Sequence, residues 1–394
     1  MSDDCEVVIA GAARTPMGGL QGCFGGLSAP HLGAVAIEAA LRRGGVAAAE
    51  IDQVIMGCVL GAGQGQAPAR QAALHAGLEV TTPCVTINKM CGSGMKAVMD
   101  GCDQIRARSS DAVIAGGMEN MSLAPYLLPK ARAGLRMGHG QLVDSMFCDG
   151  LEDAYEGGLM GEYAQASAER HQMSREAMDD FAIHSLEKAL QAQRSGWFED
   201  EIATVEVSGR RAVTTIAEDE QPAKANIDKI RALRPAFKEG GTLTAANSSS
   251  ISDGAAALLL MRHSQARALG APILCRIVAH ASYAAKPADF VTAPIGAVER
   301  LLKRTGWACA DVDLWEINEA FAAVTMLAVE ALGIEAHKVN VHGGACALGH
   351  PIGCSGARII VTLIHALQRT GGRRGIATLC IGGGEATAIA IERV

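Results

Sequence analysis

An internal repeat limits the folds open to this 394-residue chain. Three short segments, which begin at residues 51, 93 and 113, recur in the same order as segments that begin at residues 312, 355 and 379. Three matches with nearly the same offset indicate a duplicated unit. Two such halves would pack about a pseudo-twofold axis, and a cleft between them is the expected place for a site.

Strands and helices are predicted to alternate along the chain. Apolar runs at residues 7–12, 54–60 and 111–116 are typical of strands, whereas residues 31–43 and 67–76 have helical spacing. Only 4% of the residues are aromatic and 46 are glycine, which favours closely packed α/β architecture. We therefore predict an α/β fold in which crossover helices join parallel strands.

The character of the sequence changes between about residues 120 and 247, where methionine, proline, glycine and charged residues become frequent. A long amphipathic helix is predicted after Ser174. Segments of this length usually serve as lids or binding regions. We predict an N-terminal half at residues 1–119 and 248–270, an insertion with its own small core at residues 120–247, and a C-terminal half at residues 271–394.

Composition argues against several classes of function. The net charge is −7, with both signs interspersed, so no basic block suggests a nucleic-acid partner. The twelve cysteines contain no Cys-x-x-Cys pair, which argues against zinc, and their scatter through apolar stretches favours a reducing compartment. The longest apolar or glycine run, residues 254–261, is too short to span a bilayer. We expect a soluble cytoplasmic protein.

Cys91 lies between a predicted strand at residues 84–87 and a predicted helix at residues 95–105. Unpaired N–H groups and the helix dipole at such a place favour thiolate, so we expect a lowered pKa and a nucleophile. The glycines of residues 92–94 would let a substrate approach the backbone closely. The alternative is a buried and unreactive cysteine, the commoner state of a free cysteine.

Three residues of the second half are candidates for the same site. His350 lies in the glycine-rich turn that the repeat matches to the Cys91 turn, and His beside Cys activates a thiol and later returns a proton. Cys380 ends an apolar strand and is either a general base for a C–H proton or a core cysteine. Asn318 either caps the following helix or orients a water or an oxyanion.

Four motifs together resemble those of the thiolase family. They are Asn-Lys-Met-Cys-Gly-Ser-Gly around Cys91, Asn-Glu-Ala-Phe-Ala from Asn318, Gly-His-Pro-Ile-Gly-x-Ser-Gly-Ala-Arg from Gly349 and Cys-x-Gly-Gly-Gly from Cys380. The resemblance covers essentially the whole chain. It implies a thiolase-like fold of two duplicated βαβαβαββ halves, stacked in a five-layer α-β-α-β-α arrangement, with an inserted loop domain that covers coenzyme A (CoA).

The resemblance also implies a reaction, the reversible Claisen condensation of two acetyl-CoA molecules to acetoacetyl-CoA and CoA, with ping-pong kinetics. Cys91 would be acylated, His350 would take its proton, and Cys380 would remove the α-proton of the second acetyl-CoA. Asn318, through a bound water, would form one oxyanion hole with His350, and the N–H groups of Cys91 and Gly382 would form the other. The implied CoA contacts are Leu159, Met160, Leu233, Phe237, Ser249 and Phe321.

Departures from the family pattern leave alternatives open. Leu159 replaces a histidine that many biosynthetic members carry, so a longer-chain 3-ketoacyl-CoA thiolase of fatty-acid degradation remains an alternative. Pro222 stands where arginine is common, and Lys224 or Lys229 would then meet the CoA phosphates. Near His350, Cys346, Cys354 and His342 replace more usual apolar, alanine and asparagine residues.

A non-catalytic CoA- or lipid-binding relative is the alternative from another class, and it predicts the loss of a catalytic residue. The resemblance implies no metal or redox cofactor, and no nucleic-acid or membrane partner. The family usually forms homodimers or homotetramers, the twofold being built from N-terminal-half elements. Residues 125–142 are either a tetramer contact or an ordinary surface loop.

Overall fold

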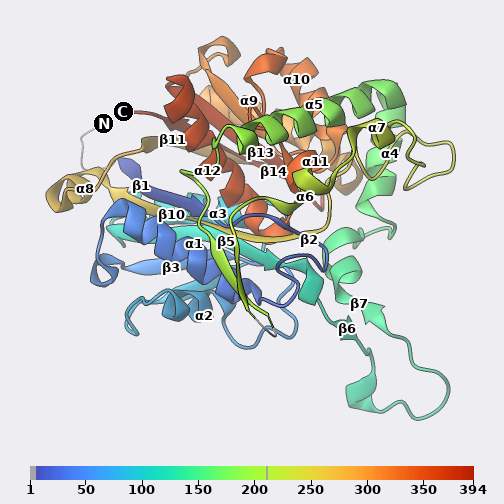
Figure 1. The fold of residues 1–394 in the computed structure, drawn as a ribbon, viewed down its shortest axis with the longest axis horizontal. Coiled ribbons are helices and arrows are strands. Elements are labelled where there is room, and N and C mark those ends of the chain that lie inside the picture. The colour runs from blue at the N-terminus through green and yellow to red at the C-terminus, as the bar shows by residue number, and fades with distance from the viewer. Residues whose placement is uncertain (1–5, 210–211) are drawn as a thin grey trace.

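The computed structural model describes residues 6–209 and 212–394, and one large sheet runs through it (Figure 1). The strands of the N-terminal half are β1 (Val7–Arg14), β2 (Gly18–Gly19), β3 (Gln53–Gly57), β4 (Cys84–Ile87), β5 (Ala112–Asn120) and β10 (Ser252–Arg262). Those of the C-terminal half are β11 (Cys275–Ala284), β12 (Leu314–Ile317), β13 (Arg374–Ile381) and β14 (Glu385–Glu392). Their order is β12-β13-β14-β11-β1-β10-β5-β3-β4, with β2 paired to β10.

The two halves of the sheet repeat one arrangement. β3 is parallel to β5, which is antiparallel to β10, which is antiparallel to β1. In the same way β12 is parallel to β13, which is antiparallel to β14, which is antiparallel to β11. The halves join where β1 meets β11 through two residue pairs, Val8 with Arg276 and Ile9 with Cys275. The predicted duplication is confirmed.

Helices and half-sheets form five layers. The outer face of the N-terminal half packs on α1 (Ala29–Gly44) and α2 (Pro68–His75), and that of the C-terminal half packs on α9 (Ala293–Thr305) and α10 (Ala322–Leu332). The inner faces of both half-sheets share one hydrophobic core with α3 (Ser93–Arg106) and α12 (Ile352–Thr370). The five-layer arrangement is therefore the predicted one.

Glycines let the two central helices pack closely at their N-terminal ends. A Cβ on Gly94 would lie 2.8 Å from the Ala357 nitrogen, and one on Gly356 would lie 2.4 Å from the Met95 nitrogen. Because Cys91 precedes α3 and His350 precedes α12, this contact brings the two turns together between the halves.

The predicted insertion supplies most of the remaining elements. They are β6 (Tyr126–Leu127), β7 (Val143–Asp144), α4 (Met160–Arg170), α5 (Arg175–Arg194), β8 (Val205–Ser208), β9 (Val213–Ile216), α6 (Glu220–Lys224) and α7 (Ile227–Ile230). Two short helices lie outside it, α8 (His263–Leu269) and α11 (Ala345–Leu348). The α5 helix begins as predicted, because the Ser174 side chain accepts a hydrogen bond from the Ala177 nitrogen.

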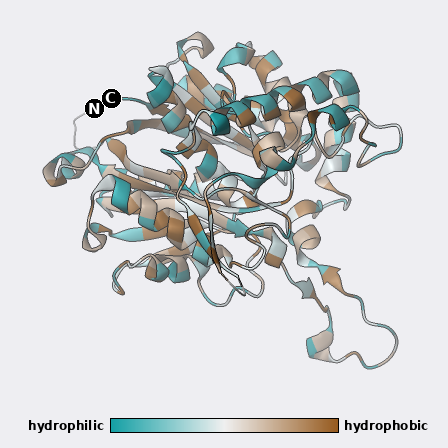
Figure 2. Cartoon of the chain, in the orientation of Figure 1, coloured by the Kyte–Doolittle hydropathy of each residue, from teal (hydrophilic) through white to brown (hydrophobic). Residues whose placement is uncertain are grey.

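Two parts of the insertion lie in different places. The α5 helix lies across the C-terminal half, against α10 and α11 (Figure 1). The β6–β7 hairpin carries an arm that projects away from the rest of the molecule, and the strands at its base bear hydrophobic residues (Figures 1 and 2). The division of the chain at residues 120 and 247 remains a prediction.

Candidate active site

A constrained turn carries Cys91. Met90, just before it, has a φ of +47°, which a residue with a side chain adopts only where its surroundings demand it. The Asn88 side chain accepts a hydrogen bond from the Met90 nitrogen at 2.9 Å. The Ser93 hydroxyl accepts one from the Lys89 nitrogen at 2.8 Å and donates one to the Met90 carbonyl at 2.7 Å. These bonds fix the position of Cys91.

The end of β13 packs against this turn and brings Cys380 and Gly382 to it. A Cβ on Gly92 would lie 2.4 Å from Ile381 Cδ1, so glycine is needed for the contact. The main-chain N–H groups of Gly382 and of Cys91 itself hydrogen-bond to the Cys91 sulfur. Burial, and then the nearby charge of Cys91, raises the pKa of Cys380 well above its usual value. The two thiols are therefore close enough to interact electrostatically.

The predicted lowering of the Cys91 pKa is wrong. Burial raises this pKa to about 11, which outweighs the lowering by the N–H groups of Gly382 and Cys91, and the charge of Glu119 raises it further. The sequence indicated the start of a helix but not the surrounding packing that keeps water from the Cys91 thiol. Cys91 is a thiol at neutral pH, so it needs a base to become a nucleophile.

His350 is in the right state to serve as that base. Its Nδ1 lies 2.6 Å from the Ser355 hydroxyl, which donates its own proton to the Pro351 carbonyl at 3.0 Å. Nδ1 is therefore the protonated nitrogen and Nε2 keeps its lone pair. Nε2 is buried and has no hydrogen-bond partner in the described part of the chain. Burial, and then the charge of Arg358, lowers the His350 pKa to about 3, so the ring is neutral.

Asn318 faces His350 and does not cap the following helix. Its Nδ2 lies 3.5 Å from His350 Nδ1, and its side chain is buried. Among the residues that the structure describes, Oδ1 of Asn318 has no hydrogen-bond partner. The α10 helix begins at Ala322 with Phe321 in the N-cap position, which removes the capping alternative. A buried amide oxygen without a partner is suited to hold a water.

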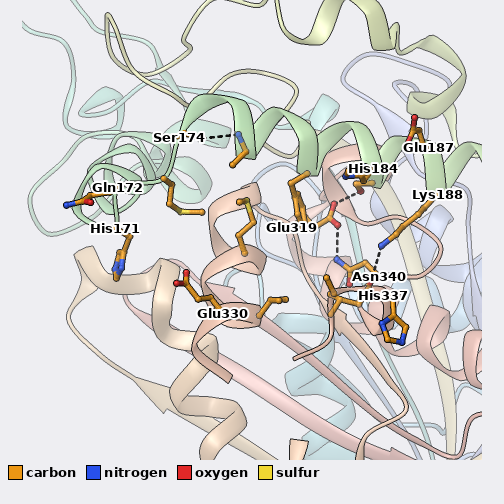
Figure 3. Close-up of a pocket in the computed structure, with 18 residues that line it drawn as sticks. His171, Gln172, Ser174, His184, Glu187, Lys188, Glu319, Glu330, His337 and Asn340 are labelled. Atoms are coloured by element: carbon orange, nitrogen blue, oxygen red, sulfur yellow. Dashed lines mark hydrogen bonds between the residues drawn. The ribbon is translucent and has the colours of Figure 1, made fainter. Parts of the chain in front are cut away.

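Glu319, which the sequence analysis did not single out, fixes the segment that carries Asn318. Its buried carboxylate accepts hydrogen bonds from the Ser185 hydroxyl at 2.7 Å and from Asn340 Nδ2 at 2.8 Å (Figure 3). It also accepts one from the Cys346 nitrogen at 3.1 Å. It thereby ties this segment to α5 and to the turn before His350. An acidic residue directly before the apolar residues 320–324 was the signal that could have found it.

A cavity away from these groups measures about 850 Å³ and lies between α5 and α10, with Glu319, Lys188 and Asn340 on one wall (Figure 3). A second cleft of about 580 Å³ adjoins Cys91. Its lining includes Met90, Met160, Gly382 and Gly383, beside residues 148–150 and 152–155. The chemistry of the thiols points to this smaller cleft.

Three of the six predicted CoA contacts lie in one apolar cluster with Cys380. These are Met160, Phe237 and Phe321, and the two phenylalanine rings meet edge to face at 6.0 Å. The other three lie in neighbouring segments. Leu159 is the N-cap of α4, the Ser249 nitrogen donates to the Ala320 carbonyl at 2.9 Å, and the Leu233 carbonyl accepts from Arg175 at 2.9 Å.

Comparison with known proteins agrees with this geometry. The family described as "Thiolase, N-terminal domain" matches residues 7–264, and "Thiolase, C-terminal domain" matches residues 271–393. The chain belongs to the thiolase family. This thiolase is 48% identical to acetyl-CoA acetyltransferase of Pseudomonas aeruginosa over 98% of the chain and 99% of that relative. It is also 48% identical to acetyl-CoA acetyltransferase 2 of Arabidopsis thaliana, over 98% of the chain and 97% of the relative.

A solved structure shares the fold of this thiolase. The acetyl-CoA acetyltransferase of Bacillus anthracis superposes with a TM-score of 0.96 at 39% identity, over 99% of each chain. The loss of a catalytic residue, which the non-catalytic alternative predicted, is not found at Cys91, His350 or Cys380.

Proposed function

We propose that this thiolase joins two acetyl-CoA molecules reversibly into acetoacetyl-CoA and CoA, through an acyl-enzyme on Cys91. One observation carries the proposal: the Cys91 sulfur lies under the N–H groups of Gly382 and of Cys91, beside a second thiol, that of Cys380. The names of the full-length relatives support the choice of acetyl-CoA.

In the first half-reaction, His350 Nε2 takes the proton of the Cys91 thiol. The Cys91 sulfur attacks the carbonyl carbon of acetyl-CoA, the bond between that carbon and the CoA sulfur breaks, and His350 returns its proton to the departing CoA thiolate. Afterwards the N–H groups of Cys91 and Gly382 hold the carbonyl oxygen of the acyl-enzyme. The low pKa of His350 keeps it in the proton-accepting form.

In the second half-reaction, His350 Nε2 takes the proton of the Cys380 thiol, and the Cys380 thiolate then removes the α-proton of a second acetyl-CoA. The resulting carbanion attacks the acetyl carbon on Cys91, so a carbon–carbon bond forms and the Cys91 sulfur leaves. Asn318, through a water, and the protonated His350 stabilise the enolate oxygen, and His350 then returns its proton to the Cys91 thiolate. Acylation keeps the Cys91 sulfur uncharged, so Cys91 does not raise the Cys380 pKa during this step.

The apolar cluster around Cys380 supports binding of the pantetheine arm of CoA by Met160, Phe237 and Phe321. We assign Leu159, Leu233 and Ser249 to the same arm on the resemblance alone. Lys224 is already paired with Glu220, which favours Lys229 for the CoA phosphates.

Acetyl transfer to Cys91 tests the proposal. After incubation with acetyl-CoA, peptide mass spectrometry should find acetyl on Cys91 of the wild type and none at that position in Cys91→Ala. Cys380→Ser should be acetylated normally but condense about 10³-fold more slowly, because only the α-proton step loses its base. An unmodified wild-type Cys91 would contradict the proposal, and equal loss of both half-reactions in Cys380→Ser would contradict the division of roles.

Leu159 favours a second candidate, a thiolase for longer 3-ketoacyl-CoA chains, because it makes the α4 end of the cleft more apolar. Thiolysis of acetoacetyl-CoA compared with its six-carbon analogue separates the two. We expect a higher kcat/KM for acetoacetyl-CoA, and a preference for the longer chain would select the second candidate.

We also propose a homotetramer made of two dimers. β4 is an edge of the main sheet, and its Val85 is 37% exposed, which suits pairing of N-terminal halves. The β6–β7 arm would join the dimers, since its apolar side chains are uncovered. Across the described residues, no helix has both the length and the apolar character to cross a membrane. A cytoplasmic location remains a proposal, which fractionation of cells would test.

A further inference from the structure

Glu119 is a fully buried acid near the end of β5 that the proposed chemistry does not use. One of its oxygens accepts hydrogen bonds from the nitrogens of Val59 at 3.0 Å and Gly353 at 2.9 Å. The other accepts from the Leu60 nitrogen at 3.2 Å and the Cys58 thiol at 3.6 Å. All four partners are donors, so the site is built for a carboxylate.

These donors come from opposite sides of the cleft. Val59 and Leu60 follow β3 in the N-terminal half and pack in one cluster with Cys91 and Ile352. Gly353 lies in the first turn of α12, three residues after His350. A Cβ on Gly353 would lie 2.6 Å from the Glu119 oxygen, so the contact also requires glycine there. One carboxylate therefore joins the loop that packs against Cys91 to the turn that follows His350.

We propose that Glu119 is a positioning residue of this thiolase, which holds the turns of Cys91 and His350 together and presents a negative charge to the Cys91 sulfur. The inference rests on the proposed function, because it concerns the same site. Glu119 would then have two separable effects on the site. Its hydrogen bonds fix the positions of the two turns, and its negative charge acts on the Cys91 sulfur.

The charge effect is visible in the groups that face Glu119. Burial raises the Glu119 pKa to about 7, against the lowering by its three N–H partners. Burial is the main cause that raises the pKa of Cys58 on the loop after β3, of Cys91 before α3 and of Cys354 on α12, and the charge of Glu119 adds to it in each case. Loss of a proton from Glu119 thus disfavours the Cys91 thiolate, and acylation of Cys91 removes the repulsion.

Glu119→Gln removes the charge and keeps the size of the side chain. We expect the pH profile of Cys91 alkylation by iodoacetamide, followed by peptide mass spectrometry, to move to lower pH. We expect kcat for condensation to fall about tenfold, since an amide cannot accept all four hydrogen bonds and the turns shift. Glu119→Asp keeps the charge but shortens the reach, so it should lower kcat without moving the profile.

Asp253→Asn is the matched control. Asp253 is also fully buried, one strand away on β10, and accepts hydrogen bonds from the nitrogen and hydroxyl of Ser122. Loss of the Asp253 charge should leave the pH profile of Cys91 alkylation unchanged. An unchanged profile in Glu119→Gln, or an equal shift in Asp253→Asn, would overturn the inference.

Two further measurements keep the test decisive. If circular dichroism finds Glu119→Gln unfolded, Gly353→Ala displaces the carboxylate without removing it, and an unchanged kcat in that variant would overturn the inference. If acetyl-CoA leaves wild-type Cys91 unmodified, the proposed function fails, whereas the alkylation profiles still report on Glu119.

Discussion

Ser355 determines which nitrogen of His350 carries the proton, because its hydroxyl donates to Pro351 and must accept from Nδ1. We predict that Ser355→Ala lowers kcat by about tenfold, since the ring can then turn or protonate at the wrong nitrogen. Steady-state kinetics would measure this. Ser109→Ala, which alters an exposed hydroxyl bonded to the Gln104 carbonyl, is the control. Equal kcat values in the two variants would show that Ser355 does not fix the protonated nitrogen of His350.

His342 makes the stability of the fold depend on pH. Burial, and then the charge of Arg369, lowers its pKa from 6.5 to about 3, and Arg369 lies 3.1 Å from its Nδ1. Between these two pKa values, His342 is protonated in the unfolded chain but stays neutral in the folded chain. Protonation therefore favours the unfolded chain, and His342 lowers the stability of the fold as the pH falls below 6.5.

We predict that His342→Asn weakens this dependence, because asparagine does not titrate. The free energy of unfolding, measured with urea, falls between pH 6.5 and about pH 4.5. We expect this fall to be roughly 2 kcal/mol smaller in the variant than in the wild type. Identical pH dependence in the two proteins would show that His342 does not stay neutral in the folded state.

Some residues of the site could be predicted from the sequence, and others could not. The turn of small residues around Cys91 and its match to the His350 turn pointed to a shared place between the halves. The direction of the Cys91 pKa could not be read there, since burial depends on packing from distant segments. Glu119 and Glu319 were missed for the same reason, as their hydrogen-bond partners lie far away in the sequence.

Among the elements, the contact between α3 and α12 tolerates no added atoms. We predict that Gly356→Ala destabilises the fold by about 1–3 kcal/mol, because its Cβ would lie 2.4 Å from the Met95 nitrogen. Urea unfolding measures the effect. Gly26→Ala is the control, since nothing lies within 4 Å of a Cβ there. A loss in Gly356→Ala no larger than in Gly26→Ala would mean that the helices can separate without cost.

Elements with strong periodicity were predictable, and those shaped by packing were not. The start of α5 follows from Ser174 alone, because a capping side chain is a local signal. The α12 helix begins at Ile352, because burial overrides the low helix propensity of Gly353 and Gly356. The alternation of strands and helices predicted the fold class. The pairing of β1 with β11 could not be predicted, because it depends on contacts between the two halves.

For the whole molecule, the projecting arm is the feature that a single chain does not explain. Met137 on the arm is 93% exposed and Leu142 is 66% exposed, so a partner would cover them. We predict that replacing residues 128–142 by a short Gly-Ser linker reduces the assembly from four chains to two. Light scattering measures the mass. Lys130→Gln, an exposed change on the same arm, should leave it unaltered, and a tetramer without the arm would contradict the prediction.

The place of β10 in the chain has a consequence for synthesis on the ribosome. This strand pairs with both β1 and β5, yet Asp253 and its neighbours are translated long after their partner Asn120. Until β10 is made, β1 and β5 lack the strand that pairs with both of them. Their unpaired edges can then pair with the wrong strands. Nascent chains of this protein are therefore expected to need shielding by chaperones until residues 252–262 leave the exit tunnel.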